Sequence, residues 1–130
     1  MSQELSRYLQ TQQDNLVSVM RISCAVVSTK VVEGTPRRTG SARASWNASK
    51  GTPKVRNIVI NAENPSQTRN NITSVTNSLQ PGETFTLANG LPYIRPLEYG
   101  SSQQARNGML RVAIAEWDEI VSDAISGNRS

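Results

Sequence analysis

Residues 3–32 read QELSRYLQTQQDNLVSVMRISCAVVSTKVV, and this stretch decides the fold. Its larger apolar residues recur at three- and four-residue steps or their sums, as on one face of an α-helix (Leu5, Leu9, Leu16, Met20, Val27 and Val31). The Ser2 hydroxyl can accept an amide of the first turn, and Gly34 followed by Thr35-Pro36 stops the helix. The sequence therefore predicts one helix of about thirty residues, with Cys24 packed in its apolar half.

The length of this helix exceeds the size of the domain that it belongs to. Thirty residues at 1.5 Å rise give about 45 Å, whereas a compact domain of 130 residues has a diameter of about 36 Å. The first turns are also the most polar, and an isolated overhang would fray. The helix therefore overhangs its own domain, bends, or packs on a neighbouring subunit. We favour the last and expect a single domain over residues 1–130, with residues 1–15 projecting toward a neighbouring subunit.

The rest of the chain predicts strands and two further helices. Alternating residues from Ala44 to Ala48 favour a half-buried strand, and the expected further strands are 55–60, 83–88 and an edge strand over 91–99. A short helix follows Asn64-Pro65, and a last helix runs from 107 or 108 to 125. This order indicates an α+β fold: an antiparallel sheet of about four strands with the C-terminal helix packed on it.

Two details of this fold can be checked against coordinates. Asn89-Gly90 is the strongest tight-turn signal in the chain. Trp46 and Trp117 are expected to meet in the core between the sheet and the last helix, which would be the largest buried contact available.

Composition excludes several classes of protein. The chain has no histidine, the commonest general base and metal ligand, and one cysteine cannot form a disulfide. No phosphate-binding glycine loop is present, and no apolar run approaches the ~20 residues of a membrane span. We expect a non-enzymatic protein without cofactor or metal, in reducing cytoplasm and not in a membrane. The 45 Ser, Thr, Asn and Gln residues indicate a hydroxyl- and amide-rich surface.

Charge is distributed unevenly along the chain, whose net charge is +4. Seven cations and one acid lie between positions 30 and 56, whereas four acids and no base lie between 116 and 123. Acids in the C-terminal half of a helix oppose its macrodipole. One interpretation is a solvated acidic face. The other is a head-to-tail subunit interface, in which one group of residues meets another on the next copy (Arg37, Arg38 and Arg43 against Glu116, Glu119 and Asp123).

Glu98 is the one carboxylate in an apolar stretch, between Leu97 and Tyr99. A structural salt bridge is the favoured role, and a catalytic acid is the alternative. The basic stretch lacks the interleaved aromatic residues of single-strand binders, and no helix carries a base-reading set of Arg, Asn and Gln, so sequence-specific recognition of nucleic acid is not expected. Its positive charge still permits salt-sensitive contact with DNA phosphates that is independent of sequence.

Two segments resemble motifs of the neck and tail-completion proteins of long-tailed bacteriophages. TPRRTGSARASW at 35–46 resembles the Pro-x-Asp-Thr-Gly-x-Leu-x-x-Ser motif after that family's first helix, although Arg38 stands at the usual Asp and Ala42 at the usual Leu. PYIRPLEYGSS at 92–102, followed by GMLR at 108–111, resembles its second motif, a Tyr-x-x-x-Leu-Glu-Tyr-Gly strand leading through a loop into the final helix. The residues that carry the resemblance are Thr39, Gly40, Trp46, Leu97, Glu98, Tyr99 and Gly100.

The resemblance implies a virion structural protein, assembled in the host cytoplasm. Such a protein forms a ring, commonly of six copies, between the head-side connector or head-closure proteins and the tail terminator or tail tube, with DNA passing through. The candidate docking loop, which orders on docking or lines the lumen, is polar (Ser101, Ser102, Gln103, Gln104 and Arg106). An ordinary surface loop is the alternative for these residues. A tail terminator in the same virion class is the first alternative. A small cytoplasmic nucleic-acid-binding adaptor is the second, and a toxin-like enzyme is a distant third.

Overall fold

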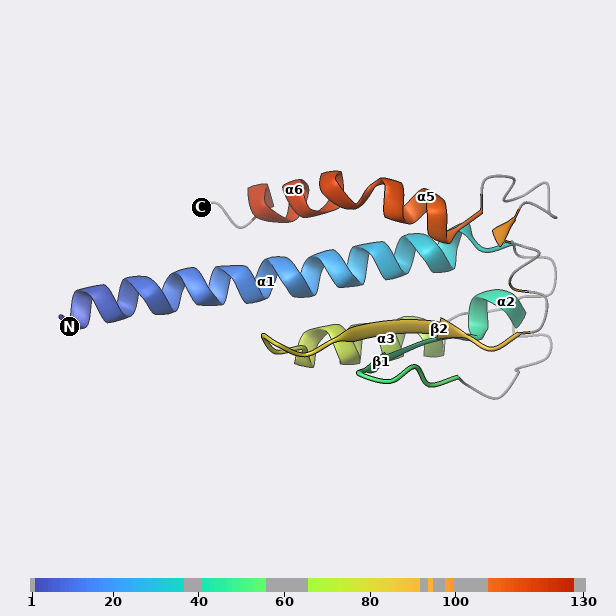
Figure 1. The fold of residues 1–130 in the computed structure, drawn as a ribbon, viewed down its shortest axis with the longest axis horizontal. Helices are drawn as coiled ribbons and strands as arrows, with labels where there is room; N and C mark the ends of the chain where they lie inside the picture. The colour runs from blue at the N-terminus through green and yellow to red at the C-terminus, as the bar shows by residue number, and fades with distance from the viewer. Residues whose placement is uncertain are drawn as a thin grey trace.

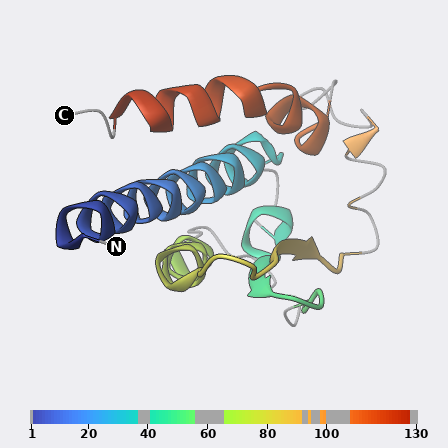
Figure 2. The ribbon, with the colours of Figure 1, turned by 60° about the vertical axis from the view of Figure 1, so that its left-hand side comes forward.

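A computed structural model describes residues 2–36, 41–55, 66–91, 94, 98–99 and 108–127, and its fold is α+β (Figure 1). The elements in chain order are α1 (Gln3–Gly34), α2 (Ser41–Ala44), β1 (Trp46–Lys50), α3 (Ser66–Ser78), β2 (Phe85–Asn89), α5 (Leu110–Ala115) and α6 (Trp117–Gly127). The long helix α1 lies in the middle: α5 and α6 pack on one side of it, and α3 with the sheet lies on the other (Figures 1 and 2). The expectation that the C-terminal helix packs on the sheet holds only for α5, which shares the core cluster with Trp46 and Ala48 of β1, whereas α6 packs on α1.

Helix α1 begins and ends as its sequence predicts. The Ser2 hydroxyl accepts a hydrogen bond from the Leu5 amide at 3.2 Å, and the helix ends at Gly34 with Thr35 in extended conformation. Every residue from 2 to 16 is exposed. Figure 1 shows this N-terminal part of α1 running past the ends of α6 and α3. We call residues 3–16 the overhang.

The sheet described by the structure has two strands rather than about four. β1 and β2 pair antiparallel, with Trp46 opposite Asn89 and Lys50 opposite Phe85. The expected edge strand is wrong where it is described, because Ile94 and Glu98 have helical backbone; prolines at 92 and 96 lack the amide protons that a ladder needs. Of the expected 55–60 strand only Val55 is described, and it lies outside the sheet.

Backbone groups on both edges of β1 make hydrogen bonds, to β2 on one edge and to a side chain of α3 on the other. Gly51 turns the chain at φ 79°, and its amide donates to the Thr84 carbonyl at 2.8 Å, which extends the ladder to β2 by one bond. On the other edge the Asn71 amide of α3 acts as a peptide group: its Oδ1 accepts from the Ala48 amide at 2.7 Å, and its Nδ2 donates to the Ala48 carbonyl at 3.2 Å. The side chain of Asn71 therefore satisfies the outward-facing peptide groups of Ala48, in the middle of β1.

The expected tight turn at Asn89-Gly90 is not formed. Asn89 is the last residue of β2, and its side chain donates to the Ala42 carbonyl at 2.8 Å and accepts from the Leu91 amide at 3.0 Å. Gly90 is not among the described glycines with positive φ. The asparagine thus fixes where the chain leaves the sheet instead of reversing it.

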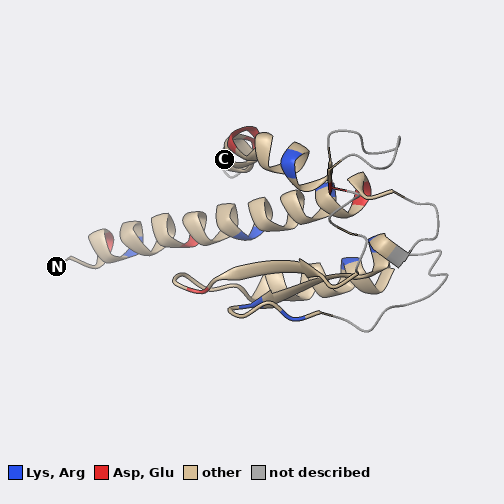
Figure 3. Cartoon of the chain, turned by 45° about the vertical axis from the view of Figure 1, so that its right-hand side comes forward, with Lys and Arg blue, Asp and Glu red and all other residues tan. Residues whose placement is uncertain are grey.

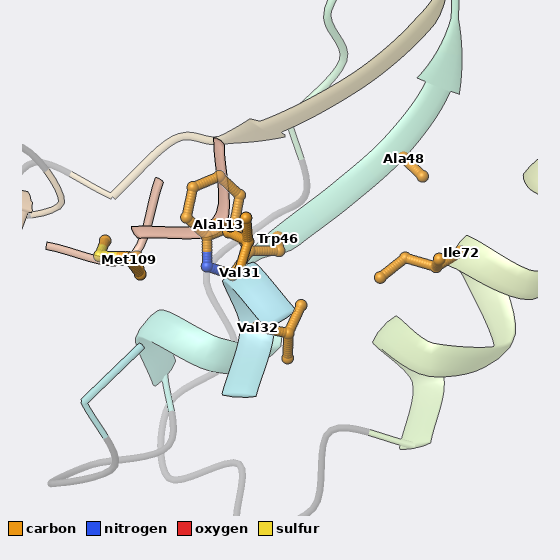
Figure 4. Close-up of a cluster of buried hydrophobic side chains, with 7 residues drawn as sticks. All are labelled: Val31, Val32, Trp46, Ala48, Ile72, Met109 and Ala113. Carbon is orange, nitrogen blue, oxygen red and sulfur yellow. The ribbon is translucent and has the colours of Figure 1, made fainter. Parts of the chain in front are cut away.

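The buried cluster is built mainly from small and medium side chains (Figure 4). It gathers residues of four elements and one loop: Val31, Val32, Trp46, Ala48, Ile72, Met109 and Ala113. Trp46 is 3% exposed, as predicted, but Trp117 is 40% exposed on α6, so the predicted contact between the two tryptophans is wrong. Trp46 lies instead at the α1 and α5 side of the cluster, near Val31 and Ala113 (Figure 4).

The two other predicted helices are present. α3 occupies the expected middle region, and the last helix is divided at Glu116, where the chain tightens through a hydrogen bond from the Glu116 amide to the Ala113 carbonyl at 3.1 Å.

Helix α1 contains an 18-residue window that is long and apolar enough to cross a membrane by length and composition. The sequence alone predicts no segment of that kind. The core helix of a packed domain passes the same criterion, and α1 packs on both sides.

Candidate functional site

The first motif segment is held by a hydrogen-bond chain around Thr35, which is fully buried. Its hydroxyl donates to the Val31 carbonyl at 2.7 Å and accepts from the Trp46 indole Nε1 at 2.9 Å. A buried indole N–H needs such a partner. Thr35 therefore connects the end of α1 to the first residue of β1.

Arg43 of the same segment binds the end of α1. Its Nε donates to the Thr35 carbonyl and its Nη2 to the Glu33 carbonyl, both at 2.6 Å. A cation is favourable at a helix C-terminus, and α1 has no basic residue of its own in its last turn. Within one subunit Arg43 therefore stabilises the C-terminal end of α1. Its predicted contact with a second copy stays a prediction.

The second motif segment is held by the Glu98 carboxylate, which caps α5. Oε1 accepts from the amides of Met109 and Leu110 at 2.9 and 2.7 Å, and Oε2 accepts from the amide and Nε of Arg111, both at 3.0 Å. Met109 itself makes no side-chain cap bond, so the donors of the first turn depend on Glu98. The predicted structural salt bridge of Glu98 is confirmed, with Arg111 as its partner.

Two further features show that the Glu98 cap is tightly built. Burial raises the pKa of the Glu98 carboxyl, but the amides of Leu110, Arg111 and Met109 and the Arg111 guanidinium outweigh it, so this pKa lies below its usual value. Gly108 has a φ of 81°, and a Cβ there would lie within 2.4 Å of the Glu98 carbonyl oxygen and Oε2. Only glycine fits this approach.

Tyr99 is the exposed neighbour of this cap. Its ring is 74% exposed, and the Arg111 guanidinium lies over it at 5.2 Å from the centroid. Tyr99 also lines a hollow of about 310 Å³ with Trp46, Leu87 and Leu110. The two motif segments meet here, because Trp46 and Met109 share the buried cluster.

The predicted acidic side of the interface lies along α6. Glu116 pairs with Lys30 of α1 at 2.6 Å, and this hydrogen bond raises the pKa of Lys30. Glu119 and Asp123 line a groove of about 550 Å³ between α1 and α6, together with Ile22 and Val26. In Figure 3 acidic residues mark α6, whereas basic residues are spread over α1, α5 and the sheet.

Four large apolar side chains on the overhang are exposed. Leu5 is 46% exposed, Tyr8 60%, Leu9 48% and Leu16 70%. Leu5, Leu9 and Leu16 share one face by helical spacing. No described residue of the chain covers this face, which we call the ridge.

Some predicted residues lie outside the described ones, so their places are not assigned. These are Arg37, Arg38, Thr39, Gly40, Leu97, Gly100, Ser101, Ser102, Gln103, Gln104 and Arg106.

Among the described ranges no group of three or more Cys, Asp or Glu side chains could hold a metal ion. Burial raises the pKa of the half-buried Cys24 thiol, which favours packing over reactivity.

Sequence reasoning missed the hydrogen-bond partners that hold the described parts of the two motif segments. Thr35 was read only as a helix stop, and Arg111 was not assigned a role. One signal was available: α5 begins without a Ser, Thr, Asp or Asn cap, so its cap must come from elsewhere in the chain.

No family model matches this chain, and no curated protein or solved structure matches it either.

Proposed function

We propose that this chain is a non-enzymatic structural subunit that assembles with copies of itself into a ring at the head–tail junction of a long-tailed bacteriophage. The observation that carries the proposal is the overhang: a helical extension with an uncovered apolar ridge. Complete burial of a leucine side chain yields about 1.5–3 kcal/mol. At their observed exposures, covering Leu5, Leu9 and Leu16 together would yield about 2–5 kcal/mol.

The resemblance of the two motif segments supports the place of such a ring. In this chain the described parts of these segments are tied to the core by the Thr35–Trp46 bond and the Glu98 cap. A hydrogen-bonded framework of this kind is a suitable support for a docking surface, and the candidate loop 101–106 comes shortly before Gly108 and α5 in the sequence. The proposed neighbours are the head connector or head-closure proteins on one side and the tail terminator or tail tube on the other, with non-specific contact to passing DNA.

The oligomeric state of the full chain tests this proposal. Light scattering after size exclusion and native mass spectrometry should show a closed oligomer, alone or with purified tail tubes. Leu5→Gln/Leu9→Gln/Leu16→Gln removes the ridge but keeps good helix formers, so this variant should be a folded monomer.

The matched control changes three polar residues of the same overhang, Gln3→Ala/Gln10→Ala/Gln13→Ala, and should assemble like the wild type. A wild type that stays monomeric at every concentration, with and without tail tubes, would refute the ring. If the monomer bound DNA tightly, with an affinity that falls steeply with salt, the adaptor function would replace it.

A further inference from the structure

The groove between α1 and α6 has an apolar floor that is open to solvent. Ile22 and Val26 of α1 are 42% and 37% exposed there, while Ile120 and Ala124 of α6 are 5% exposed each and close the base. Glu119 and Asp123 stand on its rim. Such a groove receives the side chains along one face of a helix, which is a common mode of helix recognition.

The ridge of the overhang matches this groove in chemistry and in length. Leu16 lies eleven residue steps after Leu5, or about 16 Å along the helix at 1.5 Å per residue. The groove wall formed by α6 and Glu116 before it, from Glu116 to Gly127, also covers eleven steps and has about the same length. An apolar ridge and an apolar groove of equal length are thus present on one chain.

The ridge cannot fill the groove of its own molecule. Ridge and groove wall belong to the same continuous helix, Gln3–Gly34, and a helix cannot fold back onto itself without breaking its hydrogen bonds. A ridge that fits a groove elsewhere on the same chain can join copies reciprocally in a two-fold dimer or head to tail; the proposed ring requires the head-to-tail contact, which closes when the rotation permits.

We infer that the overhang of one copy docks lengthwise in the α1–α6 groove of the next copy. This inference rests on the proposed ring and names its subunit contact. Leu5, Leu9 and Leu16 of the incoming helix cover Ile22 and Val26. The acidic residues Glu119 and Asp123 then flank the interface instead of forming its centre.

The test uses two full-length variants, each defective on one surface. The ridge variant is Leu5→Gln/Leu9→Gln/Leu16→Gln. The groove variant is Ile22→Lys/Val26→Lys, whose long side chains fill the groove while their ammonium groups meet Glu119 and Asp123, so α6 stays docked. The matched control, Thr29→Lys/Ser122→Lys, adds two lysines to the same helices at exposed positions outside the groove lining.

At concentrations where the wild type is assembled, each defective variant alone should be a folded monomer, and the control should assemble. A mixture of the two variants should form a one-to-one dimer and nothing larger, because only one ridge and one groove remain functional. Melting curves confirm folding of each variant.

Three outcomes would overturn the inference. A groove variant that assembles like the wild type shows that the ridge binds elsewhere. A groove variant that forms dimers alone shows ridge-to-ridge pairing, and two monomeric variants that do not combine show that the surfaces are not partners. In all three the wild type still forms its ring and the proposed function stands, whereas a monomeric wild type refutes the function itself.

Discussion

Substitution of Glu98 by glutamine is the most informative single change, because one carboxylate serves four donors. Glu98→Gln keeps one acceptor oxygen and replaces the other by an NH₂ group, which faces the Arg111 amide and Nε. Loss of a cap costs about 0.5–2 kcal/mol, and an amide left unpaired costs about 1–3 kcal/mol. The ion pair itself adds only about 0–1 kcal/mol, because the Arg111 side chain is 55% exposed.

The expected loss in the free energy of unfolding at pH 7 is therefore about 2–3 kcal/mol. Urea unfolding followed by tryptophan fluorescence measures it. Both proteins should carry the ridge substitutions, so that association does not add to stability. Glu33→Gln, which changes an exposed carboxylate outside the cap, is the control and should shift stability by no more than about 0.5 kcal/mol.

The pH dependence of the stability difference between wild type and Glu98→Gln shows how much of the effect comes from the charge of the Glu98 carboxylate. The folded pKa of Glu98 is below the value of about 4.3 for an unfolded glutamate. Its ionised form therefore stabilises the fold fully above that value, and this contribution disappears as the pH falls through the folded pKa. The difference between wild type and Glu98→Gln should be constant from about pH 6 to 8 and should shrink below about pH 4. A difference under about 0.5 kcal/mol at pH 7, or one that is equally large at low pH, would refute the assigned role of the carboxylate.

Three other predictions test the packing, the first of them with a matched control. Gly108→Ala should lower the free energy of unfolding by about 2–3 kcal/mol, because alanine disfavours a φ of 81° and its Cβ would displace Glu98. The control Gly127→Ala should change stability little, because a Cβ at Gly127 meets nothing within 4 Å. Equal melting temperatures for the two variants would contradict this prediction. Trp46→Ala should cost about 3–5 kcal/mol and abolish cooperative melting, and an unchanged melting temperature would contradict its burial. Ser28→Ala should raise the free energy of urea unfolding by about 1 kcal/mol, since the fully buried Ser28 hydroxyl finds no partner among the described residues; a loss of stability would show that it has one.

The helices were predictable because their signals are local. The spacing of apolar residues, the Ser2 cap and the stop at Gly34 define α1 without reference to the rest of the chain. Alternation predicted β2 for the same reason. The order of the layers was not predictable, because a hydrophobic stripe shows that a face is buried but not which element covers it. This is why Trp117 was paired with the wrong partner.

The site was predictable in part for a similar reason. Glu98 stands between apolar neighbours in the sequence, which indicates a carboxylate that is paired with a donor or a cation. The salt bridge of Glu98 was therefore expected. Its partner Arg111 lies thirteen positions away, at no helical or strand spacing. The overhang followed from length arithmetic alone, whereas the groove arises only when α6 packs against α1.

The Asn71 side chain has a consequence for how this small sheet behaves outside its native context. By occupying both backbone groups of Ala48, it blocks the pairing of an additional strand at the middle of β1. The residues of β2 that lie opposite Trp46, Ala48 and Lys50 direct their peptide groups outward instead. Among the described residues, strand addition that starts fibril growth is therefore favoured at β2 over β1.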